Sequence, residues 1–273
     1  MSSLIHRIAD AFSCLQRDAN RRNTQRRSTI ESLETRTLLT VNLVADINSL
    51  TSPSATPSNF TEVNGAVFFT AAIGQSGLEL WKTDGTSAGT MLVKDIISGS
   101  TGSRPDILTN VNGTLYFRAN DGVNGYELWK TDGTTEGTVL VKDIRSGGPF
   151  TSSYPSYLTN MNGTLYFRAI GGSDYGLELW RTNGTSAGTV LVKDIRSGSG
   201  SSAPRHLTNV NGTLYFRADD GVNGNELWKS DGTAAGTVLV KDIRSGNNSS
   251  YPTYLTDVNG TLYFRADDGV SGI

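Results

Sequence analysis

One stretch of sequence decides the fold: the octapeptide ELWKTDGT at Glu127–Thr134. Close copies begin at residues 79, 178 and 226, and their four tryptophans are 48, 51 and 48 residues apart. A regular period of roughly 20–50 residues is typical of repeat architectures, in which each unit buries its apolar faces against its neighbours. The period therefore predicts one continuous array rather than separate domains.

The unit at residues 105–144 contains four short runs that favour β-strands. Asn112-Gly113 separates the first two runs, and Asn-Gly between apolar runs is a strong signal for a tight hairpin. Adjacent residues of a strand point to opposite faces, so Leu128 and Trp129 place apolar bulk on both sides of the sheet. A sheet that is apolar on both sides needs a neighbour on each side. Four short antiparallel strands per repeat are typical of a β-propeller blade.

We therefore expect an all-β fold, a β-propeller-like array of four-stranded antiparallel blades. It has about five repeats of about 48 residues, the last one incomplete. The expected units are 55–97, 103–145, 153–196 and 202–244, with a partial unit at 250–273 and an orphan strand at 41–49 that copies a fourth strand. Pairing of the orphan strand with the last blade would close the ring. The chain stops at Ile273, where the next Glu-Leu-Trp copy would begin, which predicts a fragment of a longer repeat protein. A β-solenoid or an open array of small sheets is the alternative fold.

The first 40 residues differ in charge from the rest. They hold seven arginines and four acidic residues, a charge of +3, which leaves −5 for the remainder of a chain whose net charge is −2. Basic arms bind nucleic acid or anionic membranes, but the acidic repeats favour an export or sorting segment and no nucleic-acid partner. We expect these residues to be disordered or to form a short helix. The sequence contains no run of about 18 apolar residues, so it predicts no transmembrane helix. Cys14 is the single cysteine, so no intrachain disulfide is possible.

The repeated octapeptide, with Gly137-Thr138 after it, resembles the bacterial ELWxxDGT repeat family over about residues 41–273. The arrangement also resembles kelch-type propellers, although the paired glycines of kelch repeats are missing. The segment Leu33–Leu39 is similar to the LEPR-xLL motif at the N-terminus of large exported bacterial proteins, with Thr35 in place of the proline. These resemblances imply a secreted or cell-surface bacterial protein whose repeats have no assigned enzymatic activity.

Residues with typical catalytic or metal-binding patterns are scarce. His6 and His206 are the only histidines and lie in different regions, which argues against zinc. The sequence has no nucleophile elbow and no phosphate-binding glycine loop. We expect Glu127 and its copies to pair with lysines such as Lys130 and Lys142 rather than to form an acid–base dyad. The sequence therefore predicts no catalytic residue, no metal and no enzyme; a hydrolase or lyase that acts on polysaccharide is the alternative.

Acidic and amide residues recur in the turns. Asp84, Asp132, Asn183 and Asp231 are expected to stabilise their turns by local hydrogen bonds. The loops 120–124, 219–223 and 267–269 offer oxygen ligands that suit Ca²⁺, but they lack the carboxylate density of an EF-hand loop. We predict turns with no cofactor there, and calcium binding is the alternative.

The connections at one end of the blades vary between copies and are rich in tyrosine and arginine. Function concentrates in variable loops on a rigid scaffold, and these two residue types anchor partners well. We therefore predict a structural scaffold, or a module that binds extracellular proteins or glycans through this face. Further repeats of a longer chain are also possible partners, and a purely structural stalk is a further alternative. The candidate ligand-binding residues are Arg145, Tyr154, Tyr157, Arg196, Arg205, His206, Arg244, Tyr251 and Tyr254.

Overall fold

The computed structural model describes residues 44–45, 55–72 and 76–272. This part of the chain is all-β, with four four-stranded antiparallel sheets and one two-stranded sheet, so the predicted fold class is confirmed. The basic segment 1–40 lies outside the described residues. So does the orphan strand expected at 41–49, apart from Val44 and Ala45, which are not in a strand.

Each four-stranded sheet is a simple meander whose strands pair in chain order. The first blade holds β1 (Ser58–Val63), β2 (Ala66–Ala72), β3 (Leu78–Thr83) and β4 (Met91–Lys94). The second holds β5 (Asp106–Val111), β6 (Thr114–Asn120), β7 (Tyr126–Thr131) and β8 (Val139–Lys142). The third holds β9 (Ser156–Met161), β10 (Thr164–Gly171), β11 (Tyr175–Thr182) and β12 (Val190–Lys193). The fourth holds β13 (Arg205–Val210), β14 (Thr213–Asp219), β15 (Asn225–Ser230) and β16 (Val238–Lys241), and the two-stranded sheet holds β17 (Thr253–Val258) and β18 (Thr261–Arg265).

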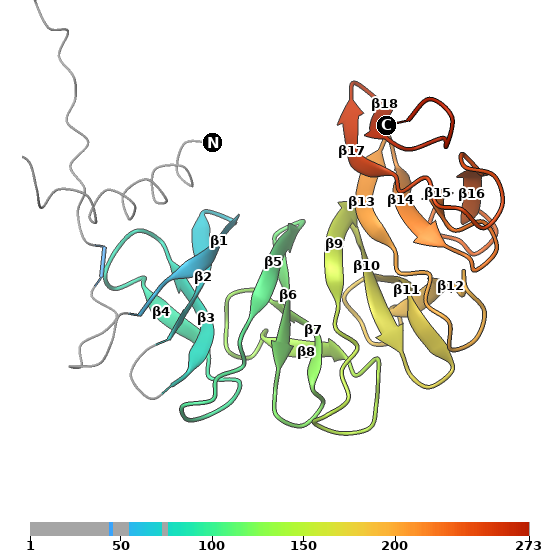
Figure 1. Cartoon of the computed structure of the whole chain (residues 1–273). Helices are drawn as coiled ribbons and strands as arrows, with labels where there is room; N and C mark the ends of the chain where they lie inside the picture. Colours follow the sequence, from blue (N-terminus) through green and yellow to red (C-terminus); the bar gives the residue numbers. More distant parts are fainter. Residues whose placement is uncertain (1–43, 46–54, 73–75, 273) are drawn as a thin grey trace, which may run out of the picture.

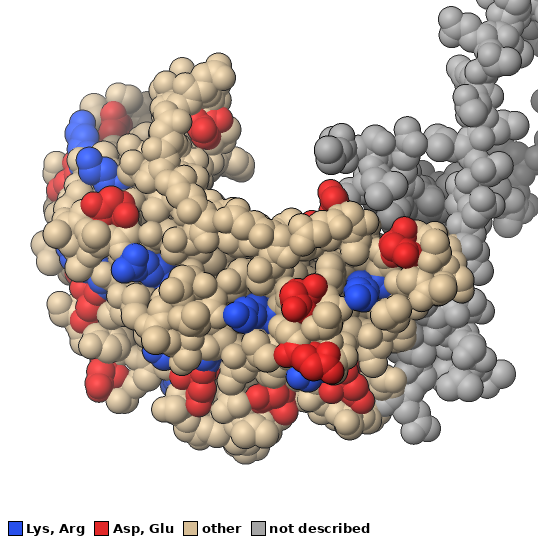
Figure 2. Space-filling model, turned by 180° about the vertical axis from the view of Figure 1, so that it is seen from behind, with Lys and Arg blue, Asp and Glu red and all other residues tan. Residues whose placement is uncertain are grey.

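The sheets stand side by side in an open, propeller-like arc (Figure 1). The first strands β1, β5, β9, β13 and β17 contact one another in that order and form the concave side. Figure 2 shows the hollow of the arc from behind, with acidic side chains along the convex edge. Any ligand that enters the hollow therefore meets the first strands.

The repeated leucine and tryptophan hold neighbouring blades together. Leu128 packs against Leu165 and Phe167 of the following blade. Trp129, the next residue, packs against Phe68 of the preceding blade. The predicted opposite orientation of Leu128 and Trp129 is thus confirmed. The same set of residues recurs between the third and fourth blades, so the Glu-Leu-Trp copies specify blade packing.

The turns also form as expected. Asn112 and Gly113 have φ values of 50° and 84°, the positive values that a tight hairpin turn requires. The carboxylate Oδ1 of Asp132 accepts hydrogen bonds from the backbone N–H of Thr134 at 2.9 Å and from its hydroxyl at 2.7 Å. The equivalent bonds occur at Asp84, Asn183 and Asp231, which confirms their turn-stabilising role.

The expected pairing of Glu127 with lysine is wrong. Glu127 is fully buried and accepts hydrogen bonds from the backbone N–H of Ser153 (2.8 Å), the Ser153 hydroxyl (2.5 Å) and the backbone N–H of Ile144 (3.2 Å). Lys142 instead donates to the carbonyl of Thr189 in the next blade. A carboxylate in the interior needs donors nearby, and the connection between blades supplies them. Each such glutamate therefore fastens the connection that follows its blade.

Candidate binding site on the concave face

Every first strand carries a bulge near its start, where the pairing register with the second strand shifts. The residue at the bulge lies in the left-handed region, which is uncommon for residues with a side chain and re-aims that side chain. The bulge residues are Asn59 (φ 56°), Ile107 (φ 49°), Tyr157 (φ 55°), His206 (φ 57°) and Tyr254 (φ 55°). The bulge thus presents a different side chain from each blade.

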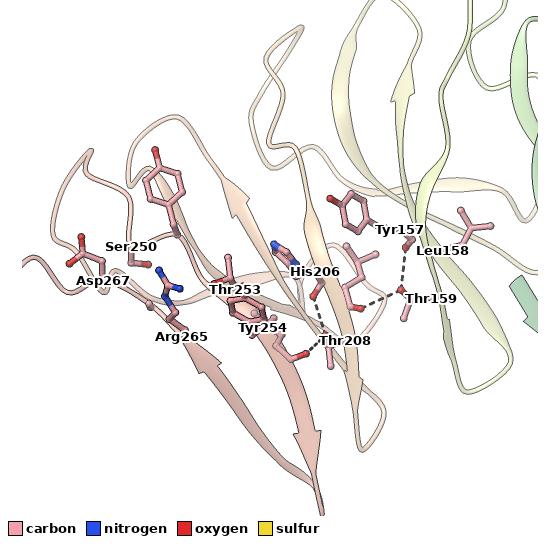
Figure 3. Close-up of a pocket in the computed structure, with 14 residues that line it drawn as sticks. Tyr157, Leu158, Thr159, His206, Thr208, Ser250, Thr253, Tyr254, Arg265 and Asp267 are labelled. Carbon is pink, nitrogen blue, oxygen red and sulfur yellow. Dashed lines mark hydrogen bonds between the residues drawn. The ribbon is translucent and has the colours of Figure 1, made fainter. Parts of the chain in front are cut away.

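The last three bulge residues line a cavity of about 750 Å³ on the concave side. Figure 3 shows Tyr157, His206 and Tyr254 on three successive first strands, β9, β13 and β17. The rings of Tyr157 and His206 are 6.3 Å apart and meet edge to face. The cavity therefore has an aromatic lining drawn from three blades.

Threonine hydroxyls lie between these strands. The Thr159 hydroxyl is 3.1 Å from the carbonyl oxygen of Tyr157 on its own strand and 3.4 Å from that of Leu207 on the next strand (Figure 3). The Thr208 hydroxyl is likewise 3.1 Å from the carbonyl oxygen of His206 and 3.3 Å from that of Leu255. Each hydroxyl has a single proton to donate, and its shorter contact is with its own strand.

A row of arginines follows the same side on the second strands. Arg118, Arg168, Arg217 and Arg265 occupy equivalent positions, and each faces the start of the neighbouring first strand. Arg118 forms an ion pair with Asp106. Arg168 Nε donates to the Ser156 hydroxyl at 2.7 Å. Arg217 lies opposite a second arginine, Arg205. The positive charge of the row is thus neutralised in the second blade and accumulates in the fourth.

The arginines and the aromatic rings are interleaved. The guanidinium carbon of Arg168 lies 4.6 Å from the centre of the Tyr157 ring, and that of Arg217 lies 5.8 Å from the centre of the Tyr251 ring. Such cation–π contacts hold a guanidinium flat against a ring and leave its N–H groups at the edge for a ligand. The arrangement combines flat apolar surfaces with fixed positive charge.

The electrostatics of the cavity reflect this crowding. Burial lowers the pKa of the Arg217 guanidinium, and the neighbouring Arg205 lowers that pKa further. Burial, followed by Arg217 and Arg205, also lowers the pKa of His206, so its imidazole is neutral at pH 7. A neutral imidazole has one N–H donor and one acceptor nitrogen. The site therefore pairs unneutralised positive charge with one neutral polar ring.

The predicted site residues fall into two groups. Tyr157, His206, Tyr251 and Tyr254 meet at the cavity, and Arg205 lies next to it opposite Arg217. The others have different surroundings. Tyr154 stacks on Tyr126 with ring centres 5.8 Å apart, and Arg145 lines a separate hollow beside Tyr175. Arg196 and Arg244 form ion pairs with Asp219 (2.9 Å) and Asp267 (2.7 Å) of the following sheets.

Sequence reasoning missed Arg168 and Arg217. Both belong to the repeated string Thr-Leu-Tyr-Phe-Arg, and repeated residues were interpreted as scaffold. The residues opposite these arginines could have revealed them. The partner changes from Asp106 to Ser156 to Arg205 in successive blades, while the arginine itself is repeated. Only the bulge register shows which residues are opposite one another.

The loops considered for calcium are closed turns. Asp121 Oδ1 accepts hydrogen bonds from the backbone N–H groups of Val123 (2.9 Å) and Asn124 (2.7 Å), and Asp220 and Asp268 do the same in their loops. Among the described residues, no three His, Cys, Asp or Glu side chains gather as a metal site would require. Within the same ranges, no helix has the length and apolar character needed to cross a bilayer.

Comparison with known proteins extends the description of the fold. No protein-family model matches the sequence, and none of the curated proteins does. Among solved structures, the chain is similar to a puromycin hydrolase (15% identity, TM-score 0.41) over 73% of this chain and 31% of that one. A puromycin-hydrolyzing peptidase of Mycobacterium tuberculosis is similar at 12% identity and a TM-score of 0.46 over 79% and 34%. An α-L-arabinofuranosidase of Clostridium thermocellum is similar at 16% identity and a TM-score of 0.33 over 76% and 80%. This chain thus spans about a third of the length of the two hydrolases of puromycin, and the likeness concerns the propeller-type fold alone.

Proposed function

We propose that this chain is a non-enzymatic binding module of the ELWxxDGT repeat type, from a secreted or cell-surface bacterial protein. In this proposal it contacts an extracellular glycan or protein through the concave side at the variable-loop end. The observation that carries the proposal is the set of bulge residues Tyr157, His206 and Tyr254, which hold left-handed backbone conformations around one cavity.

The left-handed bulge recurs in every first strand and so belongs to the repeat, and the last three blades use it to present aromatic side chains to one cavity. A residue with a side chain in the left-handed region costs on the order of 1–2 kcal/mol, and such positions cluster where the strain serves binding or catalysis. Tyr157 and Tyr254 nevertheless remain 37% and 73% exposed. Folding gains little from aromatic rings left in water, whereas a ligand that covers them gains their apolar area.

The rigid surroundings support the same function. The strands β9 and β13 below two of the rings belong to blades joined by a packed core, and β17 lies against β13. A ligand that meets side chains already held in place avoids the entropic cost of ordering them. A rigid concave side of this kind is suited to recognition, and a purely structural stalk would not need it.

Binding to an array of glycans and bacterial envelope proteins tests the proposal. The wild-type chain should bind at least one class of ligand, and Tyr157→Ala with Tyr254→Ala should weaken that binding at least about tenfold, as removal of an aromatic anchor does. Tyr175→Ala is the matched control, because Tyr175 is 40% exposed but lines the separate hollow. The proposal is wrong if the array shows no ligand, or if the variant with both Tyr157→Ala and Tyr254→Ala binds as the wild type does.

A further inference from the structure

Two arginines face each other at the start of the fourth blade, next to the residue His206 that lines the cavity. Arg205 at the start of β13 lies directly opposite Arg217 on β14. Like charges directly opposite one another destabilise an antiparallel pair. Among the described residues, neither guanidinium forms an ion pair with a carboxylate.

Other blades show how the same position is neutralised. In the second blade, Asp106 stands where Arg205 stands, and it binds Arg118 through both of its carboxylate oxygens. In the third blade, the hydroxyl of Ser156 accepts a hydrogen bond from Arg168. The second blade thus carries, in its own sequence, the carboxylate that the fourth blade lacks.

Arg217 is buried with unused hydrogen-bonding capacity. Only 9% of the residue is exposed, and its Nε atom has no hydrogen-bond partner among the described residues. Nη1 of Arg168, stacked on Tyr157, is also buried without such a partner. A buried donor without an acceptor is costly, and a charged donor more so. Both of these atoms are covered by protein, so the guanidinium that an incoming acceptor meets is that of Arg205, which is exposed.

We propose that Arg205, with the positive charge of Arg217 opposite it and of Arg168 in the preceding blade, binds the carboxylates of an acidic polysaccharide that lies along the concave side. This inference rests on the proposed function and names its ligand class. The ligand carboxylate takes the place that Asp106 occupies in the second blade, because the planar fork of a guanidinium matches a carboxylate with two parallel hydrogen bonds. The sugar rings pack on the exposed faces of Tyr157, Tyr251 and Tyr254.

Two observations favour a polysaccharide over a nucleic acid. The chain beyond residue 40 carries a net charge of −5, and acidic side chains line the convex edge (Figure 2). Nucleic acid binds through many phosphate contacts along a broad positive surface. The unneutralised charge here is confined to a few arginines among tyrosines, which suits a chain with one carboxylate per sugar ring.

Isothermal titration calorimetry of the full chain with polygalacturonate and alginate tests the inference. Methyl-esterified forms of both polymers keep the sugar and remove the charge. The wild-type chain should bind the acidic forms at least about tenfold more tightly than the esters, because hydrogen bonds between charged partners are stronger than those between neutral ones. Arg205→Asp, which copies the second blade, should weaken binding of the acidic forms by a similar factor. Lys229→Asp makes the same charge change on the exposed part of β15 in the same blade and should bind as the wild type does.

The outcomes separate this inference from the proposed function. Equal binding of acid and ester, or unchanged affinity of Arg205→Asp, overturns the carboxylate site while tyrosine-dependent binding on the array still stands. Tighter binding of polyglutamate or single-stranded DNA than of either uronate overturns the choice of polysaccharide. No ligand on the array and no heat with any polymer overturns both. Circular dichroism establishes that each variant is folded, and Arg205→Ser, which copies the third blade, replaces Arg205→Asp if that variant is not.

Discussion

Arg205 lies directly opposite Arg217 in the β13–β14 pair, at the position where the β5–β6 pair places Asp106 opposite Arg118. One pair repels and the other forms an ion pair. Two blades with the same backbone arrangement thus carry charges of opposite sign at the position that faces the repeated arginine. The fourth blade has a charge arrangement that does not favour folding, and the proposed carboxylate site would account for it.

Stability should respond to this position in opposite directions in the two blades. Arg205→Asp creates the ion pair that the second blade already has, so we expect the free energy of unfolding to rise by about 0.5–1 kcal/mol. Asp106→Arg should lower it by a similar amount. Urea unfolding at low salt measures both changes. A fall in stability for Arg205→Asp would show that the two arginines do not oppose folding.

The buried Glu127 should give the protein an unusual pH dependence. Burial raises the pKa of Glu127 to about 7, against the opposing effect of the hydrogen bonds from Ser153 and Ile144. A carboxyl whose pKa is higher in the folded state than in the unfolded state stabilises the fold fully below the unfolded value. That stability is lost as the pH rises through the folded value. The loss for Glu127 should therefore fall between about pH 4.5 and pH 7.

Glu127→Gln isolates this effect, because glutamine does not titrate. The unfolding free energy of the wild type minus that of the variant should decrease by about 2–3 kcal/mol from pH 4.5 to pH 7.5. Other titrating groups are present in both proteins and cancel in this difference. Urea unfolding at several pH values supplies the measurement, and a difference that stays flat would mean that Glu127 keeps an ordinary pKa in the fold.

The interblade packing predicts a large cost for losing a repeated tryptophan. Trp180 of the third blade packs in the core formed with Leu128 and Val141 of the second. Trp180→Ala should lower the unfolding free energy by about 3–5 kcal/mol, since the cavity left between two fixed sheets collapses little. Val123→Ala, at an exposed loop position, should change it by no more than about 0.5 kcal/mol. Thermal unfolding compares the two, and equal effects would contradict the assigned packing.

Ile107 tests the strain at the bulges. It is the β-branched member of the bulge series and has a φ of 49°, whereas the first blade has Asn59 there at 56°. Asparagine tolerates the left-handed region far better than isoleucine does. Ile107→Asn should therefore raise the unfolding free energy by about 1 kcal/mol. Chemical denaturation measures it, and a clear loss of stability would show that packing of the isoleucine outweighs its backbone strain.

The sequence predicts the blade well because the blade is encoded locally and repeatedly. The Asn112-Gly113 turn, the alternation at Leu128 and Trp129, and the Asp132 turn each follow from a few neighbouring residues. The role of Glu127 does not, because its partner Ser153 lies 26 residues away in the connection between blades. The lysines that surround Glu127 in the sequence suggested an ion pair, and only the fold shows that the glutamate is buried.

Only part of the candidate site could be predicted, because the roles of its residues depend on non-local contacts, as the role of Glu127 does. Variation between copies pointed to Tyr157, His206 and Tyr254, which do meet at one cavity. Arg196 and Arg244 were predicted because they follow the fourth strands on the same side, and the structure places them in ion pairs between neighbouring sheets. These roles depend on the bulge register and on which residues adjoin across blades, and neither follows from a local pattern.

The most direct test of the account is the affinity for polygalacturonate of four proteins that differ only at position 205. The chain itself supplies the series: arginine in the wild type, serine as at Ser156, threonine as at Thr253 and aspartate as at Asp106. If the unneutralised guanidinium pair holds a carboxylate, calorimetric affinity should be highest for arginine, lower for Arg205→Ser and Arg205→Thr, and lowest for Arg205→Asp. The same affinity for all four folded proteins would contradict the account.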